Sequence, residues 1–282
     1  MINGLHHVTA IAGDAQRNID YYTGALGLRL VKVTVNYDDP GGYHFYYGDE
    51  QASIGTLVTH FPIVGGRHGQ PGAGQAIEMA YAVPDLSRYA HLGETTERFG
   101  QKVIAFQDPD GIGLAFVEAP GDLRLHSVTL LEREIKPTES LLIGEMGVTF
   151  EAEEGGRRRY RTGDCYVDLL IDPGAWPGRM GVGVIHHTAF RTENEATQLE
   201  HRSRLQALGA NVSPVRDRQY FRSIYFFEPG GALFEIATEG PGIGIDETVE
   251  ELGSSLKLPP MYEDQRAQIE AKLPKIRVPR KA

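Results

Sequence analysis

One order of segments occurs four times along the 282-residue chain. A strand-like stretch is followed by a helical stretch and then by further strand-like stretches that turn residues separate. The four opening stretches begin near residues 5, 76, 125 and 183. Because a single unit of this size cannot bury its own apolar face, repeated units must pack against one another. Strands outnumber helices, so the sequence predicts an α+β fold of four βαβββ modules in two pseudo-symmetric domains.

Each module is predicted to contain one helical stretch after its opening strand. We expect these stretches at 15–26, where Gly27 provides a C-cap, and at 87–100, 139–146 and 193–209. The module spacing places an N-terminal domain at 1–121 and a C-terminal domain at 122–240. The remaining tail, 241–282, is predicted to be extended with one helix.

Composition and charge argue against a nucleic-acid partner, a membrane-spanning protein and a secreted one. The formal net charge of −10 argues against a nucleic-acid partner, since an acidic surface repels phosphates. No run of about 18 apolar residues occurs, which predicts no membrane span, and the N-terminus lacks the pattern of a signal peptide. The single cysteine, Cys165, fits a reducing compartment. We therefore expect a cytoplasmic protein.

Two histidine pairs open the first and fourth modules: His6-His7 and His186-His187. Neighbouring side chains on a strand alternate between its faces, so one histidine of each pair is expected to face a shared interior. A hydrogen-bonded core histidine is the ordinary explanation for a lone histidine on a strand. The same dipeptide at equivalent positions of a repeat instead indicates a metal site.

The other two modules indicate which histidine of each pair is the ligand. Laid over the first pair by its opening strand, the second module has Met79 at the second position, and the third module has Ser127 there. The third module nevertheless keeps a histidine, His126, at the first position. A histidine that a module keeps although it lacks the second histidine is more consistent with a structural role than with metal binding. We therefore predict His7 and His187 as ligands.

Glu235 is the candidate third ligand. It lies in a strand with apolar neighbours on both sides, where a bare carboxylate would cost several kcal/mol, about as much as a broken buried ion pair. A salt bridge is the alternative to a bound cation. Two imidazoles and one carboxylate with open positions opposite suit Fe(II) and O2, and Mn(II) accepts the same ligands. The first and fourth modules must then lie together, leaving the second and third as the half without metal.

Three motifs resemble a known family: residues 4–11 (GLHHVTAI), 184–190 (VIHHTAF) and 229–235 (PGGALFE). They are similar to the vicinal-oxygen-chelate superfamily and, within it, to the ring-cleaving dioxygenases that open hydroquinones. The resemblance implies that βαβββ modules form two open-barrel domains. It also implies that iron binds at His7, His187 and Glu235.

The resemblance further implies an Fe(II)-dependent, extradiol-type cleavage of a hydroquinone or catechol-like aromatic by O2. It also implies that His6, His186, Arg218 and Tyr225 are the residues that surround the metal ligands. His6 or His186 would be the acid–base, Tyr225 would hydrogen-bond the substrate or an oxygen species, and Arg218 would orient the substrate. Gln219 departs from the pattern, because the hydroquinone enzymes tend to have glycine there. We expect a small aromatic substrate and O2 as partners, and a homo-oligomer.

Two other functions remain open at this point. A glyoxalase-type lyase or thiol transferase would need a fourth protein ligand, for which His60 and Glu118 are candidates that match the register of Glu235 poorly. A metal-free protein that sequesters an aromatic ligand would bind no metal. The arginine run at 157–161 follows a Gly-Gly turn and is predicted to be an exposed hairpin.

Overall fold

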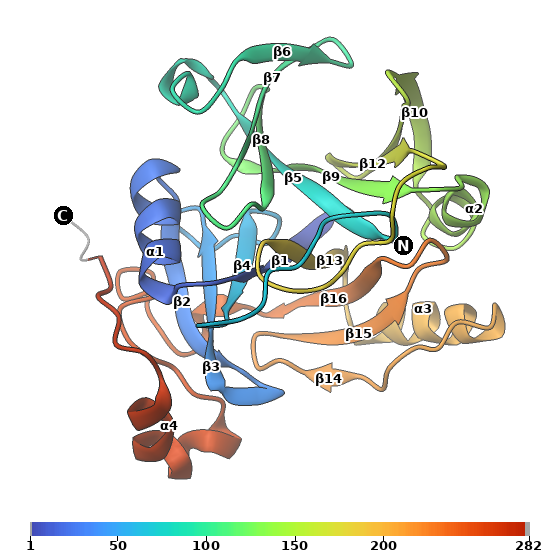
Figure 1. Cartoon of the computed structure of the whole chain (residues 1–282). Coiled ribbons are helices and arrows are strands. Elements are labelled where there is room, and N and C mark those ends of the chain that lie inside the picture. The colour runs from blue at the N-terminus through green and yellow to red at the C-terminus, as the bar shows by residue number, and fades with distance from the viewer. Residues whose placement is uncertain (1, 280–282) are drawn as a thin grey trace.

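Two eight-stranded sheets form the molecule, and the computed structural model describes residues 2–279 (Figure 1). The first sheet has the strand order β14-β15-β16-β13-β1-β4-β3-β2, and the second has the order β10-β11-β12-β9-β5-β8-β7-β6. The first contains β1 (Leu5–Ala12), β2 (Arg29–Asn36), β3 (Asp39–Gly48), β4 (Leu57–Pro62), β13 (Val184–Thr192), β14 (Arg216–Asp217), β15 (Phe221–Phe227) and β16 (Leu233–Pro241). The second contains β5 (Gln75–Val83), β6 (Thr95–Arg98), β7 (Gln101–Gln107), β8 (Gly113–Glu118), β9 (Arg124–Glu132), β10 (Thr149–Glu154), β11 (Arg157–Thr162) and β12 (Cys165–Ile171).

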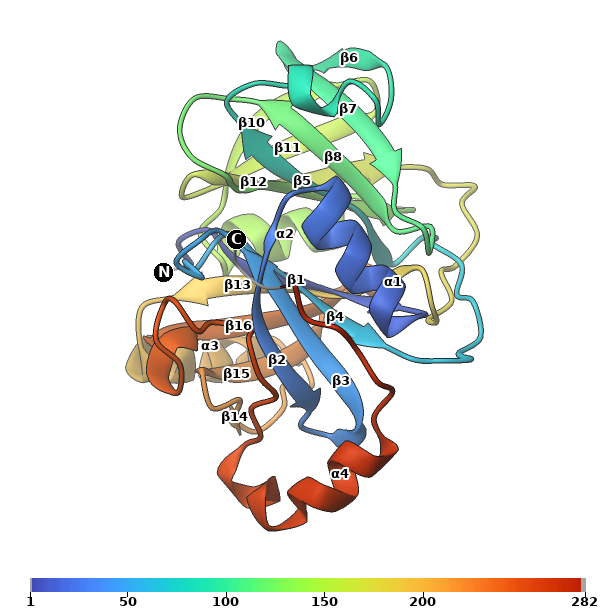
Figure 2. The same cartoon turned by 90° about the vertical axis from the view of Figure 1, so that its left-hand side faces the viewer.

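Each sheet curls and combines two modules, as the α+β prediction requires (Figure 2). The first sheet joins the first and fourth modules, and the second joins the second and third. The expected pairing of the first module with the fourth is therefore confirmed. The domain boundaries at residues 121 and 240 stay a prediction. Each sheet contains one module that precedes residue 121 in the sequence and one module that follows it.

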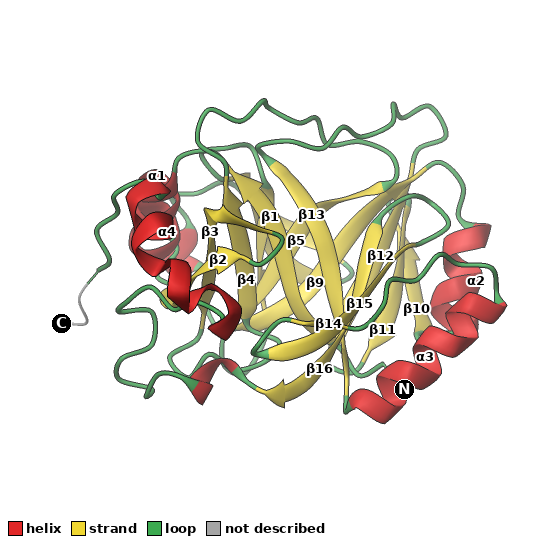
Figure 3. Cartoon of the chain, turned by 90° about the horizontal axis from the view of Figure 1, so that it is seen from below, coloured by secondary structure: helices red, strands yellow, loops and turns green. Residues whose placement is uncertain are grey.

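Helices lie at the periphery of the strands (Figure 3). α1 (Ala15–Asp20) continues as a π-helical turn, η1 (Tyr21–Ala25), and Gly27 follows in the left-handed conformation predicted for its C-cap. The other helices are α2 (Lys136–Gly144), α3 (Glu195–Ala207) and α4 (Arg266–Lys272), with 3-10 turns η2 (Ser87–Tyr89), η3 (Ile243–Ile245) and η4 (Pro260–Gln265). No helix within residues 2–279 is long and apolar enough to span a membrane.

The predicted helix over 87–100 is wrong. Its first residues form only the short turn η2, and the stretch then becomes strand β6, which pairs with β7. Gly93 interrupts the helical pattern, and the β-branched Thr95 and Thr96 favour the strand. Tertiary pairing with β7 thus outweighs a weak helical propensity.

A pseudo-twofold axis relates the two modules of the first sheet. β1 and β13 pair antiparallel about Val8 and Thr188, which face each other. On either side of this pair the register slips once, so that His6 in β1 and His186 in β13 are extra residues without a partner. Such β-bulges bend a strand and redirect its side chains. The fold therefore places a bulge at the first histidine of each pair.

The chain after β16 runs along the outside of the first sheet, and Arg277 is hydrogen-bonded to Gln16 of α1 (Figure 2). Tyr262 donates a hydrogen bond to the Tyr37 carbonyl at 3.0 Å, and Tyr43 donates to the Pro274 carbonyl at 3.1 Å. This C-terminal segment, 241–279, therefore closes one side of the first half-barrel.

Candidate active site

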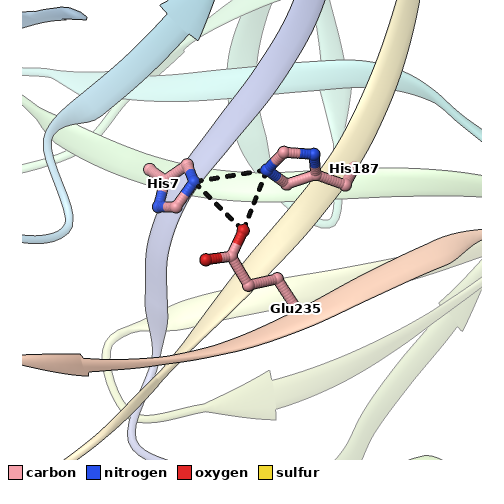
Figure 4. Close-up of side chains that lie close together, drawn as sticks. All are labelled: His7, His187 and Glu235. Atoms are coloured by element: carbon pink, nitrogen blue, oxygen red, sulfur yellow. Dashed lines mark hydrogen bonds and ion pairs between the residues drawn. The ribbon is translucent and has the colours of Figure 1, made fainter. Parts of the chain in front are cut away.

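Three buried side chains converge inside the first half-barrel: His7 from β1, His187 from β13 and Glu235 from β16 (Figure 4). His7 Nε2 lies 3.4 Å from His187 Nε2 and 3.4 Å from Glu235 Oε2, and His187 Nε2 lies 2.9 Å from the same oxygen. Their exposed fractions are 1%, 5% and 0%. Among residues 2–279, this is the one group of three such side chains close enough to share a metal ion.

The donor set fits a divalent metal ion. Glu235 Oε1 accepts a short hydrogen bond from the Ser223 hydroxyl, whereas Oε2 is buried with no hydrogen-bond donor oriented toward it. A buried carboxylate oxygen facing two imidazole nitrogens is costly unless a cation joins them. Two imidazoles and a carboxylate on one side also match the facial arrangement of non-haem iron sites.

The histidine neighbours do not point to opposite faces, which corrects the expectation from strand alternation. His6 Nδ1 lies 2.8 Å from His7 Nδ1, and His186 Nδ1 lies 2.7 Å from His187 Nδ1. The bulges at His6 and His186 turn these rings back toward the next residue. With Nε2 free for a metal, Nδ1 of each inner ring carries the proton and donates it to the neighbour, which fixes the tautomer.

Burial keeps this cluster in the protonation state that a metal needs. It lowers the pKa of His6 and of His186 to about 3, with a further contribution from the neighbouring histidine in each pair. It also lowers the pKa of His187. Burial alone would raise the pKa of Glu235, but His7 and His187 hold that pKa well below its ordinary value. His6, His186 and His187 are therefore neutral and Glu235 is ionised near neutral pH.

Arg218 and Tyr225 lie together beside the triad. Arg218 Nε donates to the Tyr225 hydroxyl at 3.1 Å, and its Nη2 forms an ion pair with Asp38 at 2.9 Å. The Tyr225 ring packs edge-on against His187 with centroids 5.7 Å apart. Gln219 has the left-handed backbone (φ 65°) that favours glycine, and its side chain donates to Asp246. Gln219 does not line the pocket described next.

A pocket of about 810 Å³ opens over the triad. Its wall includes the inner and outer histidines His7, His187 and His186, but not His6. Sequence reasoning missed most of the wall, because strands and the C-terminal segment bring it together from distant parts of the chain. The further lining side chains include Tyr37, Asp38, His44, Tyr46, Phe61, Ile63, Val64, Arg218, Phe221, Tyr225, Leu233 and Lys272.

Neither candidate for a fourth ligand joins the triad. His60 is buried against Tyr22 and Tyr47, with ring centroids 4.2 and 5.6 Å away, and both of its nitrogens lack a hydrogen-bond partner. Glu118 belongs to the second sheet, where it pairs with Lys102. Within the described residues, the cluster therefore consists of three side chains that could bind a metal.

The second sheet repeats the geometry without the histidines. Its central pair is Met79 with Val128, so Glu78 and Ser127 occupy the register positions of His7 and His187. The expected match of Met79 with His7 is therefore wrong by one residue, because the bulge residue that corresponds to His6 is Ile77 and not Glu78. Module three keeps the outer contact, since His126 Nδ1 lies 3.1 Å from the Ser127 hydroxyl.

An arginine lies beside the second-sheet counterpart of Glu235. Asp168 has the register of Glu235, and Arg159 has that of Tyr225. Arg159 Nε and Nη2 each donate to Asp168 at 2.8 Å, and both residues are buried. The prediction that the whole arginine run is exposed is wrong at Arg159, whose guanidinium balances this buried acid.

Comparison with known proteins places the chain in a family. The model of the glyoxalase/bleomycin resistance protein/dioxygenase superfamily matches residues 4–74 and 142–236. MhqO of Bacillus subtilis, named as a ring-cleaving dioxygenase, is 41% identical over 95% of this chain and 94% of its own. The chlorohydroquinone/hydroquinone 1,2-dioxygenase of Sphingobium indicum is 33% identical over 95% of each chain.

Solved structures agree with this relationship. A crystal structure of a Bacillus subtilis protein assigned as a dioxygenase superposes with a TM-score of 0.92 at 40% identity, covering 99% of both chains. Glyoxalase I of Zea mays shares the fold alone, with a TM-score of 0.64 at 17% identity over 84% of this chain and 92% of its own. The chain belongs to the glyoxalase/bleomycin resistance protein/dioxygenase superfamily. Within that superfamily it is an enzyme of the ring-cleaving dioxygenase group.

Proposed function

We propose that this enzyme binds Fe(II) through His7, His187 and Glu235 and uses O2 to open the ring of a hydroquinone or catechol-like aromatic in an extradiol-type reaction. The observation that carries the proposal is a buried three-ligand cluster that opens onto a pocket large enough for an aromatic ring. The relatives named as ring-cleaving dioxygenases support the reaction class, and the hydroquinone 1,2-dioxygenase supports the substrate. Mn(II) is the second metal to test.

Bound iron would supply the electron transfer between the aromatic hydroxyl and O2 that the protein itself cannot provide. The three ligands come from one side, which leaves the pocket side for the substrate oxygen and O2. Arg218 places a positive charge at the pocket wall, where it attracts a deprotonated substrate oxygen. Asp38 and the Tyr225 hydroxyl hold the guanidinium in that orientation.

His186 is the acid–base candidate that the pocket favours. It lines the pocket, whereas His6 does not. When its Nδ1 accepts from His187, its Nε2 carries the proton of the neutral ring, so Nε2 is the atom that can donate a proton or a hydrogen bond to the substrate. Tyr225 also lines the pocket and would hydrogen-bond the substrate or an oxygen species; burial together with Glu235 raises its pKa, so it stays a neutral phenol. A positioned acid–base contributes about 100-fold to 10,000-fold to such reactions.

The direct test is O2 uptake with hydroquinone or catechol by protein loaded anaerobically with Fe(II). Replacing His187→Ala should lower metal affinity by at least about 100-fold and abolish O2 uptake in the same preparation. His91→Ala is the matched control, because His91 is exposed and lies outside the pocket. Full iron content in the His187→Ala protein would contradict the assignment of this ligand.

The same measurements address the alternatives. A metal-free binding protein predicts that wild-type protein takes up neither Fe(II) nor Mn(II) stoichiometrically. A lyase predicts turnover of a thiol adduct without O2 uptake. We also propose a homo-oligomer, which light scattering tests, and a cytoplasmic location, which fractionation of the source cells tests.

A further inference from the structure

The pseudo-twofold axis of the first sheet assigns a partner position to Glu235. Parallel pairing sets Ala189 opposite Glu235 on one side of the axis and Thr9 opposite Thr59 on the other. Thr9 and Ala189 are themselves related by the axis, because they pair with His187 and His7. Thr59 therefore occupies the position in the first module that Glu235 occupies in the fourth.

The surroundings of these two positions correspond as well. Tyr225 pairs with Glu235, and Tyr46 pairs with Thr59. Two residues earlier on each strand, Ser223 donates to Glu235 Oε1, and His44 Nε2 lies 2.8 Å from the Thr59 hydroxyl. Each module thus presents a side chain from its fourth strand toward the centre and holds it with a side chain from its third.

Thr59 is fully engaged in this arrangement. Its hydroxyl is hydrogen-bonded to His44 and, at 2.8 Å, to the hydroxyl of Thr9, which lies on the same face of β1 as His7. A threonine is two bonds shorter than a glutamate, so it does not extend to the metal as its counterpart does. The first module therefore contributes one ligand, His7, where symmetry allows two.

We propose that Thr59 is the specificity-determining residue that keeps the metal centre at three protein ligands, with His44 as its positioning residue. This inference rests on the proposed function. A carboxylate at position 59 would supply a second acid related by the axis to Glu235 and would fill one of the positions left for oxygen ligands. Thr59 reserves that position for the aromatic hydroxyl or O2, and thereby separates dioxygenase chemistry from the chemistry of a closed four-ligand site.

Thr59→Glu is the first test. The additional charged ligand should raise Mn(II) affinity, measured by isothermal titration calorimetry, by at least about tenfold, since affinity follows the ligand charge count. O2 uptake by the Fe(II)-loaded variant should fall by at least about 100-fold, about as much as loss of one catalytic group. Unchanged Mn(II) affinity in a folded Thr59→Glu protein would overturn the proposal.

A second buried acid can prevent folding, so an exchange variant completes the test. Glu235→Thr alone should weaken Mn(II) binding by at least about 100-fold, as expected for a lost ligand. Glu235→Thr combined with Thr59→Glu restores both the ligand number and the number of buried acids, and should bring Mn(II) affinity back to within about tenfold of wild type. Glu235→Thr combined with Thr162→Glu is the matched control, because Thr162 is buried in the second sheet.

The outcomes separate the inference from the proposed function. If the exchange variant binds Mn(II) no better than Glu235→Thr alone or the control, the inference is overturned whatever reaction the wild-type protein performs. If wild-type protein binds Mn(II) and the exchange restores binding, but no aromatic supports O2 uptake, the proposed function fails and the assignment of position 59 stands. Wild-type protein without metal affinity would overturn both.

Discussion

At the scale of single residues, the outer histidines decide how the inner ones are presented to a metal. His6 and His186 are bulge residues whose Nδ1 atoms lie within hydrogen-bond distance of Nδ1 of the inner rings. A histidine that ligates through Nε2 needs such an acceptor at Nδ1, both to select the tautomer and to hold the ring plane. The adjacent pair therefore works as one unit in each strand, a ligand and its support.

His6→Leu should lower metal affinity about 10-fold to 100-fold without removing a ligand, the usual effect of losing such a support. His6→Asn keeps a side-chain acceptor near Nδ1 and should recover part of that affinity. Calorimetric titration with Mn(II) at pH 7.5 measures both variants. Equal affinity of the leucine and asparagine variants would mean that His6 acts only by filling space.

The ligand residues could be predicted from the sequence because the repeat places two histidine pairs at equivalent positions and the acid lies in an apolar strand. Further residues around the site could not. His44, Tyr46 and Thr59 reach the site through pairing registers between strands. A register depends on where bulges fall, and a bulge is set by tertiary packing rather than by the local pattern.

At the scale of elements, each sheet has a buried acid at an equivalent position, and the charge of that acid is balanced differently in the two sheets. The first sheet gathers an acid and two histidines, which fits a metal ion. The second has a buried acid at the same position, Asp168, and pairs it with Arg159. The rings of Phe99 and Tyr166 cover the guanidinium at 4.0 and 4.6 Å. In the second half-barrel, the cation that balances the buried acid is therefore the guanidinium of Arg159.

Arg159→Met should destabilise the protein by about 3–5 kcal/mol, because it leaves Asp168 buried and unpaired. Adding Asp168→Asn should recover part of this loss. Urea unfolding measures the change, with Arg161→Met as the matched control. Arg161 lies two residues away on the same strand and pairs with Glu151 at the surface, where a pair contributes about 0–1 kcal/mol. Equal losses from both single variants would contradict the distinction.

The helical elements show where a local pattern is a weak guide. Helix α3 begins at Glu195 behind a capping box formed by Asn194 and Thr197, a signal present in the sequence. No such cap precedes residue 87, where the predicted helix is replaced by a turn and β6. A capping box thus distinguishes α3 from the turn η2, although α2 forms without a side-chain cap.

At the scale of the whole molecule, an acid pair joins the two half-barrels. Glu228 follows β15 and accepts from the backbone of Gly230 and Ala232 and from the Thr138 hydroxyl of α2. Glu132 ends β9 of the second sheet and is buried beside it. Burial, followed by the charge of Glu228, raises the pKa of Glu132 to about 8. Glu132 is therefore the member that holds a proton at neutral pH.

This pair should make stability depend on pH. The folded state binds the Glu132 proton more tightly than the unfolded state, so its stabilising effect is complete below the unfolded pKa and is lost as pH rises through about 8. Between pH 6 and 9 the wild-type protein should lose on the order of 1–2 kcal/mol more than Glu132→Gln. Urea unfolding at both pH values tests this, with the exposed Glu134→Gln as control. Parallel pH profiles for wild type and Glu132→Gln would refute it.

In the sequence, the strands of the second sheet lie between the two groups of strands that form the first sheet. The second sheet is assembled from one continuous stretch, 75–171, whereas the first needs residues 5–62 and 184–241. During synthesis the second sheet can form while β1 still waits for β13, about 180 residues behind it. Domains generally fold as units when their chain is complete, and contacts distant in sequence form late. His7 is therefore synthesised about 180 residues before His187, and the pocket for the metal can close only after β13 and β16 have been translated.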